Sequence, residues 1–165
     1  RDRKTAEDRE QIRAAILDGR IDVVATDHAP HTKEEKNGSY FKAPSGGPLV
    51  QHALVAMLDM VHDGVLSVEK VADLMAHRVA RLFRMSDRGF IRPGMKADLV
   101  LVHPNDPWTV REDNVMSKCG WSPFQGHTFK SRVHETWVNG TCVWDGRRIT
   151  TSHGNHAGQR LSFNR

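Results

Sequence analysis

Residues that could do chemistry gather in one short stretch, Asp27-His28-Ala29-Pro30-His31. A carboxylate can bind a metal ion or carry a proton, and imidazole is a common metal ligand and general base. An aspartate alone at such a place is usually a turn or cap residue. Two imidazoles within four residues of it favour metal or oxyanion chemistry instead. We therefore take this stretch as the candidate active-site segment.

The element that must position this cluster is the apolar run just before it, residues 21–26. Its six residues follow Gly19 and leave little room for apolar–polar alternation, which predicts a strand buried on both faces, as in a parallel sheet. Asp27 would then stand at the carboxyl end of that strand, where α/β enzymes place catalytic groups.

A helix is predicted ahead of the strand. Thr5 is a good N-cap with Asp8 in the first turn, apolar residues follow at helical spacing, and Gly19 suits the position after the helix. Helix, tight turn and buried strand together make half of a βαβ unit.

The cluster also carries a family resemblance. Thr26-Asp27-His28-Ala29-Pro30-His31-Thr32, followed by Glu34-Glu35-Lys36, resembles the last barrel-strand motif of dihydroorotases, which are metal-dependent cyclic amidohydrolases. Allantoinases and dihydropyrimidinases resemble the motif up to the Asp-His pair and usually diverge after it. His31 is therefore the residue that points to dihydroorotase.

The resemblance implies roles for particular residues. Asp27 would be a metal ligand and the acid/base group that moves a proton to the leaving ring nitrogen, and His31 would bind the substrate carboxylate. Pro44, Ser45 and Gly46 would make backbone contacts to the pyrimidine ring, although from the residues alone this segment equally suits a plain turn. His28 receives no catalytic role.

The implied reaction is the reversible cyclisation of N-carbamoyl-L-aspartate to L-dihydroorotate in pyrimidine biosynthesis. Two zinc ions per site would supply the metal chemistry in the complete enzyme, by lowering the pKa of bound water and polarising the carbonyl. The expected partner of the site is this small-molecule substrate.

The later chain predicts helices over 49–61, 67–75 and 76–83 and then strands. The segment 90–102, with its Pro93-Gly94 turn, resembles a strand–turn–strand pattern shared widely by amidohydrolases, in which Asp98 is structural. Residues 118–126 resemble a segment that packs against the barrel, and Asn139-Gly140 predicts a tight hairpin within 133–144.

These elements predict an α/β fold: the last part of a (β/α)8 amidohydrolase barrel (helix 7, strand 8, helix 8) followed by part of a small β-sandwich. Residues 1–86 would form the barrel part, and residues 87–165 the sandwich segment and tail. Such a barrel needs about 250 residues, so we expect the chain to be the C-terminal portion of an enzyme and inactive alone. Unpaired edges of strand 8 would then favour association, or the parent would be a homo-oligomer.

The remaining ligands of the family site are missing from this sequence. Its ten histidines include no His-x-His pair, and one aspartate cannot hold a catalytic zinc ion, which takes about three protein ligands. His153 and His156, in a Gly-rich tail, are given no metal role. Two alternative functions stay open: another cyclic amidohydrolase (allantoinase, dihydropyrimidinase or hydantoinase), and a non-catalytic dihydroorotase-like assembly domain.

Composition narrows the class of protein further. The net charge of +4 is spread among mixed charges, which argues against a nucleic-acid-binding surface. The charged start, residues 1–4, leads into no apolar signal segment, and no apolar run is long enough for a membrane span. Cys119 and Cys142 lack a CxxC partner, so we expect two buried thiols. So few cysteines also favour a reducing, cytoplasmic setting.

Overall fold

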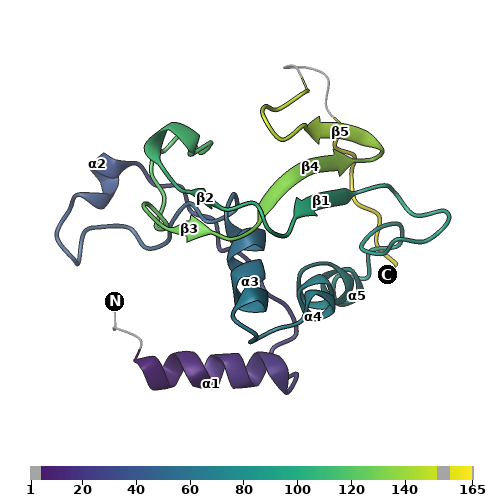
Figure 1. Cartoon of the computed structure of the whole chain (residues 1–165), viewed down its shortest axis with the longest axis horizontal. Helices are drawn as coiled ribbons and strands as arrows, with labels where there is room; N and C mark the ends of the chain where they lie inside the picture. Colours follow the sequence, from purple (N-terminus) through teal and green to yellow (C-terminus); the bar gives the residue numbers. More distant parts are fainter. Residues whose placement is uncertain (1–4, 152–156, 165) are drawn as a thin grey trace.

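The computed structural model describes residues 5–151 and 157–164 (Figure 1). Residues 1–4 and the tail residues His153 and His156 lie outside this part. The helices are α1 (Ala6–Leu17), α2 (Lys33–Lys36), α3 (Ala53–His62), α4 (Val68–Ala72) and α5 (Arg78–Leu82), with a π-helical turn at Asp73–His77 and a 3-10 turn at Glu112–Asn114. The strands are β1 (Leu99–His103), β2 (Trp108–Thr109), β3 (Thr128–Phe129), β4 (Arg132–Val138) and β5 (Thr141–Trp144).

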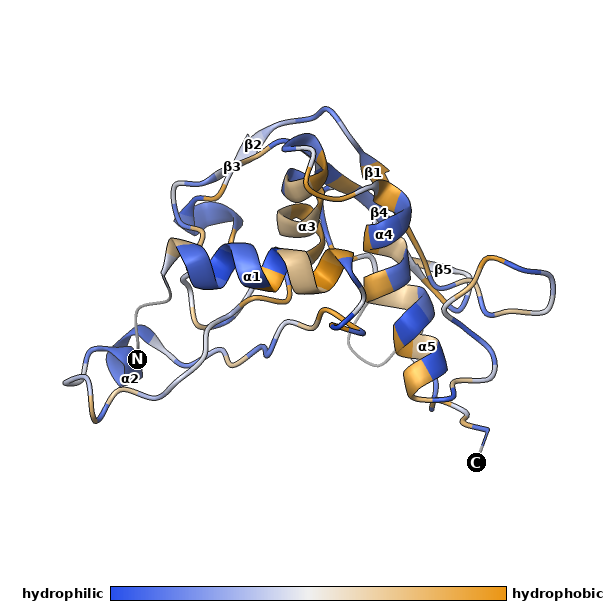
Figure 2. Cartoon of the chain, turned by 90° about the horizontal axis from the view of Figure 1, so that it is seen from below, coloured by the Kyte–Doolittle hydropathy of each residue, from blue (hydrophilic) through white to orange (hydrophobic). Residues whose placement is uncertain are grey.

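The predicted first helix is confirmed, together with its caps. The Thr5 hydroxyl accepts the Asp8 amide at 3.0 Å, and the Asp8 carboxylate accepts the Thr5 amide at 2.8 Å. Gly19 follows the helix with φ +87°, a left-handed conformation that glycine adopts at no steric cost. Figure 2 shows α1 hydrophilic over its first half and hydrophobic towards its end, where Ile16 is buried.

Helix α3 lies at the centre of the molecule (Figure 1) and contributes to two cores. Met57 packs with residues of α1 and of the α4–α5 region: Ile16, Leu66, Val71 and Leu74. Val55 packs instead with Val110 and Phe129, beside the β2–β3 pair. Helix α3 therefore joins the core of the helical part to the separate core of the β part.

The strands form two antiparallel sheets. One has the order β1-β4-β5, and the other is the short pair β2-β3. The predicted hairpin is confirmed: β4 and β5 are joined by Asn139-Gly140, whose φ angles of +49° and +79° are both positive, as a type I′ turn requires.

The strand predicted over 21–26 is wrong in this structure. These residues have no ladder partner among the described residues; Val24 instead donates its amide to the Leu74 carbonyl at 3.3 Å. A strand exists only where a second extended segment supplies donors and acceptors, and here the neighbour is a helix. One isolated parallel bridge, His28–Gly47, follows at the end of the run.

The chain after Pro30 contains α2, a one-turn helix capped by Thr32. One further expectation changes. Phe90 and Ile91 form no strand: Phe90 stacks on His77 with ring centroids 4.7 Å apart, and the Gly89 carbonyl lies 2.6 Å from His77 Nδ1. These helix contacts hold the segment away from the sheet, which begins only at Leu99.

Both cysteines are free; Cys119 is buried, as predicted, whereas Cys142 is only half-buried. None of the helices in the described part of the chain combines the length and the apolar character that a membrane crossing needs.

Candidate functional site

Asp27 occupies a turn at the end of the extended run. Its φ of +46° is a left-handed conformation, which aspartate tolerates better than most residues. Its side chain is exposed, and no hydrogen bond to the carboxylate is present among the described residues. The turn therefore presents a carboxylate that is free to take a ligand.

His28 anchors this turn. Its Nδ1 accepts the amides of Leu49 and Val50, at 3.1 and 3.2 Å. Two donors at Nδ1 place the ring proton on Nε2. The imidazole thereby ties the Asp27 turn to the chain that enters α3, a structural use of the second residue in the cluster.

The loop 44–46 is held against the same turn. Ala29 donates its amide to the Gly47 carbonyl at 3.0 Å. Gly46 has φ +92°, and a Cβ atom there would lie 2.5 Å from the Ala29 Cβ. Only glycine fits this approach, so the close contact between the two segments depends on Gly46.

His31 lies directly before Thr32, the N-cap of α2. Its Nδ1 lies 3.4 Å from Glu35 Oε2. The same Glu35 carboxylate accepts the Thr32 amide at 2.8 Å, while Thr32 Oγ1 accepts the Glu35 amide at 3.2 Å. This capping box fixes the carboxylate beside the imidazole, which is 36% exposed and so remains open to a ligand.

The structure thus brings the His28–His31 segment and the Pro44–Gly46 loop together. Lys36 and Trp121 also contact these segments; they lie in the 34–36 and 118–126 motifs, but the resemblance implies no role for either. Their contacts to His31 and to the loop cross up to 90 residues of chain, a relation that no local pattern reveals.

Other candidate groups are structural. Asp98 accepts Arg88 Nη1 at 2.7 Å and the Asn139 amide at 2.7 Å, so it braces the hairpin turn. His52 is 1% exposed and stacks on Trp108 and Phe129. Burial lowers the pKa of His52, because the charged imidazolium loses its hydration.

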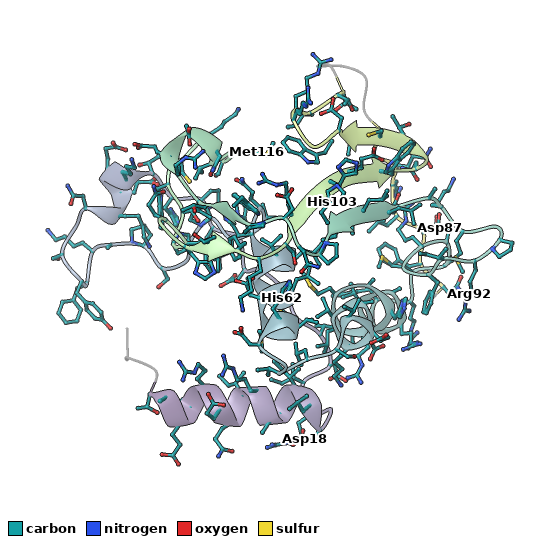
Figure 3. All side chains as sticks on the ribbon, in the orientation of Figure 1. Asp18, His62, Asp87, Arg92, His103 and Met116 are labelled. Carbon is teal, nitrogen blue, oxygen red and sulfur yellow. The ribbon has the colours of Figure 1, made fainter. Side chains whose placement is uncertain are left out.

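His62, at the end of α3 (Figure 3), also serves the fold. Its Nε2 lies 2.9 Å from the Pro104 carbonyl and 3.0 Å from Ser131 Oγ. These contacts tie α3 to Pro104, between β1 and β2, and to Ser131, between β3 and β4, which is a structural use of this histidine.

The described residues do not complete a metal site. Within residues 5–151 and 157–164, no three His, Cys, Asp or Glu side chains come together as ligands. Asp27 is a single donor, and a catalytic zinc ion needs about three. This chain by itself does not fit the metal centre that the resemblance implies.

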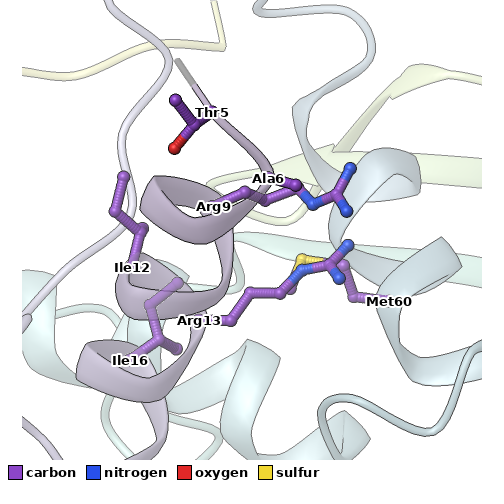
Figure 4. A pocket seen from close by; sticks show the side chains of 7 residues that line it. All are labelled: Thr5, Ala6, Arg9, Ile12, Arg13, Ile16 and Met60. Carbon is purple, nitrogen blue, oxygen red and sulfur yellow. The ribbon is translucent and has the colours of Figure 1, made fainter.

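A hollow of about 520 Å³ lies elsewhere, along α1 (Figure 4). Arg9 and Arg13 extend from the helix towards Met60 of α3, and Ile12 and Ile16 line the helix side. Among the described residues, no carboxylate or imidazole borders it, and neither the Asp27–His31 segment nor the 44–46 loop contributes to it. It is not the candidate site.

Comparison with known proteins identifies relatives of the chain. The amidohydrolase family profile matches residues 38–144, more than half of the chain. A dihydroorotase from Halobacterium salinarum is 44% identical over 151 residues, which cover 92% of this chain and 36% of the relative. A dihydroorotase from Clostridium acetobutylicum is 38% identical, covering 86% of this chain and 33% of the relative.

A solved structure shares the fold. The dihydropyrimidinase from Brevibacillus agri superposes with a TM-score of 0.85 over 89% of this chain and 33% of that protein, at 24% identity. The chain therefore spans about a third of the length of the proteins it matches.

Proposed function

The chain belongs to the amidohydrolase family, and from that premise we propose that it is the C-terminal part of a dihydroorotase, which interconverts N-carbamoyl-L-aspartate and L-dihydroorotate. The observation that carries the proposal is the 44% identity to a dihydroorotase over nearly the whole chain. The arrangement of the site supports it, because the segment with Asp27 and His31 packs directly on the 44–46 loop.

In this proposal each side chain has a defined task. Asp27 takes and returns the proton that reaches the ring nitrogen when the cyclic amide opens. His31 donates a charge-assisted hydrogen bond to the substrate carboxylate. Pro44, Ser45 and Gly46 offer backbone groups to the ring; the amides of Ser45 and Gly46 have no partner within the described residues.

The metal centre would be shared with sequence outside this chain. Asp27 would contribute one ligand to the zinc ions, and the other ligands would come from the remaining two-thirds of the protein. Zinc bound there would supply a water activated at neutral pH.

The test compares Asp27→Asn with Asp22→Asn in the complete protein that contains this chain. Asp22 is an exposed carboxylate five residues earlier and serves as the control. We expect Asp27→Asn to lower dihydroorotase turnover by about 10²–10⁴-fold and Asp22→Asn to leave it unchanged. Wild-type turnover of hydantoins or dihydropyrimidines but not of dihydroorotate would favour the hydantoinase alternative. A wild-type protein inert towards all these substrates would favour the assembly-domain alternative.

A further inference from the structure

Lys36 and Trp121 lie between the two segments that the proposed function assigns to the substrate. Lys36 closes the one-turn helix that begins after His31, and Trp121 comes from the later segment that follows the 3-10 turn. Both side chains are half-buried. Neither has a task in the chemistry described above.

Lys36 fixes the shape of the 44–46 loop. Its Nζ donates to the Pro44 carbonyl at 2.7 Å and to the Gly46 carbonyl at 2.9 Å. An ammonium group has three donors in a small volume, so two carbonyls that are two residues apart must turn towards the same point. The loop is therefore curved around the Lys36 head group.

Trp121 fixes the other segment. Its indole Nε1 donates to the His31 carbonyl at 2.7 Å. The Lys36 ammonium lies 5.8 Å from the centroid of the Trp121 ring, within cation–π range. The ring also borders Gly47, where a Cβ atom would lie 3.6 Å from Trp121. One indole thus contacts the His31 backbone, the Lys36 charge and the end of the loop.

We propose that Lys36 and Trp121 are positioning residues that hold His31 and the Pro44–Gly46 loop in a single arrangement for substrate binding. The inference rests on the proposed dihydroorotase function. The two residues touch no substrate themselves; they act through the backbones of the residues that do. Their loss should therefore weaken binding much more than it slows the chemical step.

The first experiment measures steady-state kinetics with dihydroorotate in the complete protein. Lys36→Met removes both hydrogen bonds and keeps the length of the side chain. Lys42→Met is the matched control, because Lys42 is an exposed lysine of the same loop whose side chain has no partner within the described residues. We expect Lys36→Met to raise KM about tenfold and to change kcat less than about threefold, with Lys42→Met at wild-type values. Lys36→Arg, which keeps the donors, should recover most of the loss.

Trp121→Phe gives an independent variant. It keeps an aromatic ring but removes the donor to His31. The control is Trp137→Phe, which removes an indole donor to Glu135, both half-buried residues of β4. Trp121→Phe should raise KM, and Trp137→Phe should not. Equal KM values for Lys36→Met and Lys42→Met, or a fall in kcat with an unchanged KM, would overturn the proposal.

Amide hydrogen exchange separates this proposal from the proposed function. In the complete protein, Lys36→Met should speed exchange at the Ala29 amide, which donates to Gly47 at the end of the loop, and Lys42→Met should not. If the wild type turns over no dihydroorotate and the exchange difference is present, the proposed function fails while the positioning role stands. Exchange that is the same in both variants would refute the positioning role.

Discussion

Replacing Gly46 by alanine should disrupt the contact that joins the loop to the Asp27–His31 segment. Two effects add. The φ of +92° at Gly46 is unfavourable for any residue with a Cβ atom, by about 1–2 kcal/mol. The new Cβ would also lie 2.5 Å from the Ala29 Cβ, and forcing such an overlap typically costs about 1–3 kcal/mol. We expect a total loss of about 2–5 kcal/mol in the free energy of unfolding.

Gly19→Ala is the matched control for this prediction. Gly19 has nearly the same φ, +87°, but nothing lies within 4 Å of a Cβ atom built there. It should therefore show only the conformational part of the loss. Urea denaturation of both variants would give the difference, which we expect to be about 1–3 kcal/mol.

A double-mutant cycle isolates the contact itself. Ala29→Gly removes the Cβ that Gly46→Ala would meet, so the pair of substitutions together should recover the steric part of the loss. If Gly46→Ala and Gly19→Ala destabilise equally, or if Ala29→Gly brings no recovery, the close approach of the two segments is not what requires glycine, and the reasoning is wrong.

Two further predictions concern groups outside the site. Burial lowers the pKa of His52 below its ordinary value of 6.5, so as the pH falls the unfolded chain binds a proton at this residue before the folded chain does. The free energy of unfolding should therefore decrease below about pH 6.5, by at most about 1.4 kcal/mol per pH unit. His52→Phe keeps the ring stacking and should flatten that decrease in urea titrations at pH 5 and 7. Asp98→Ala should lower the free energy of unfolding by about 2–4 kcal/mol, because the buried Arg88 loses one carboxylate partner and the Asn139 amide loses its acceptor. As the control, Asp113→Ala removes an exposed ion pair and should change the free energy of unfolding by less than about 1 kcal/mol. Equal losses in the two variants would contradict the structural role of Asp98.

The sequence by itself determined the features that depend on neighbours along the chain. The caps of α1 and α4 each join a side chain to a backbone amide three residues further on: Thr5 Oγ1 accepts the Asp8 amide, and Ser67 Oγ accepts the Lys70 amide. The hairpin turn needs only Asn139-Gly140 with their positive φ angles. The residue types of the candidate site, Asp27 and His31, are likewise visible in a single stretch.

Tertiary structure decided everything that needs a partner distant in the chain. The apolar run 21–26 has the composition of a buried strand, but a ladder requires a second extended segment, and the described residues place a helix carbonyl there. Phe90 does not form the predicted strand, because its ring stacks on His77 instead. The contacts of Lys36 and Trp121 depend on packing between segments up to 90 residues apart, and hydrogen-bond partners at such separations follow from the fold and not from local residue patterns.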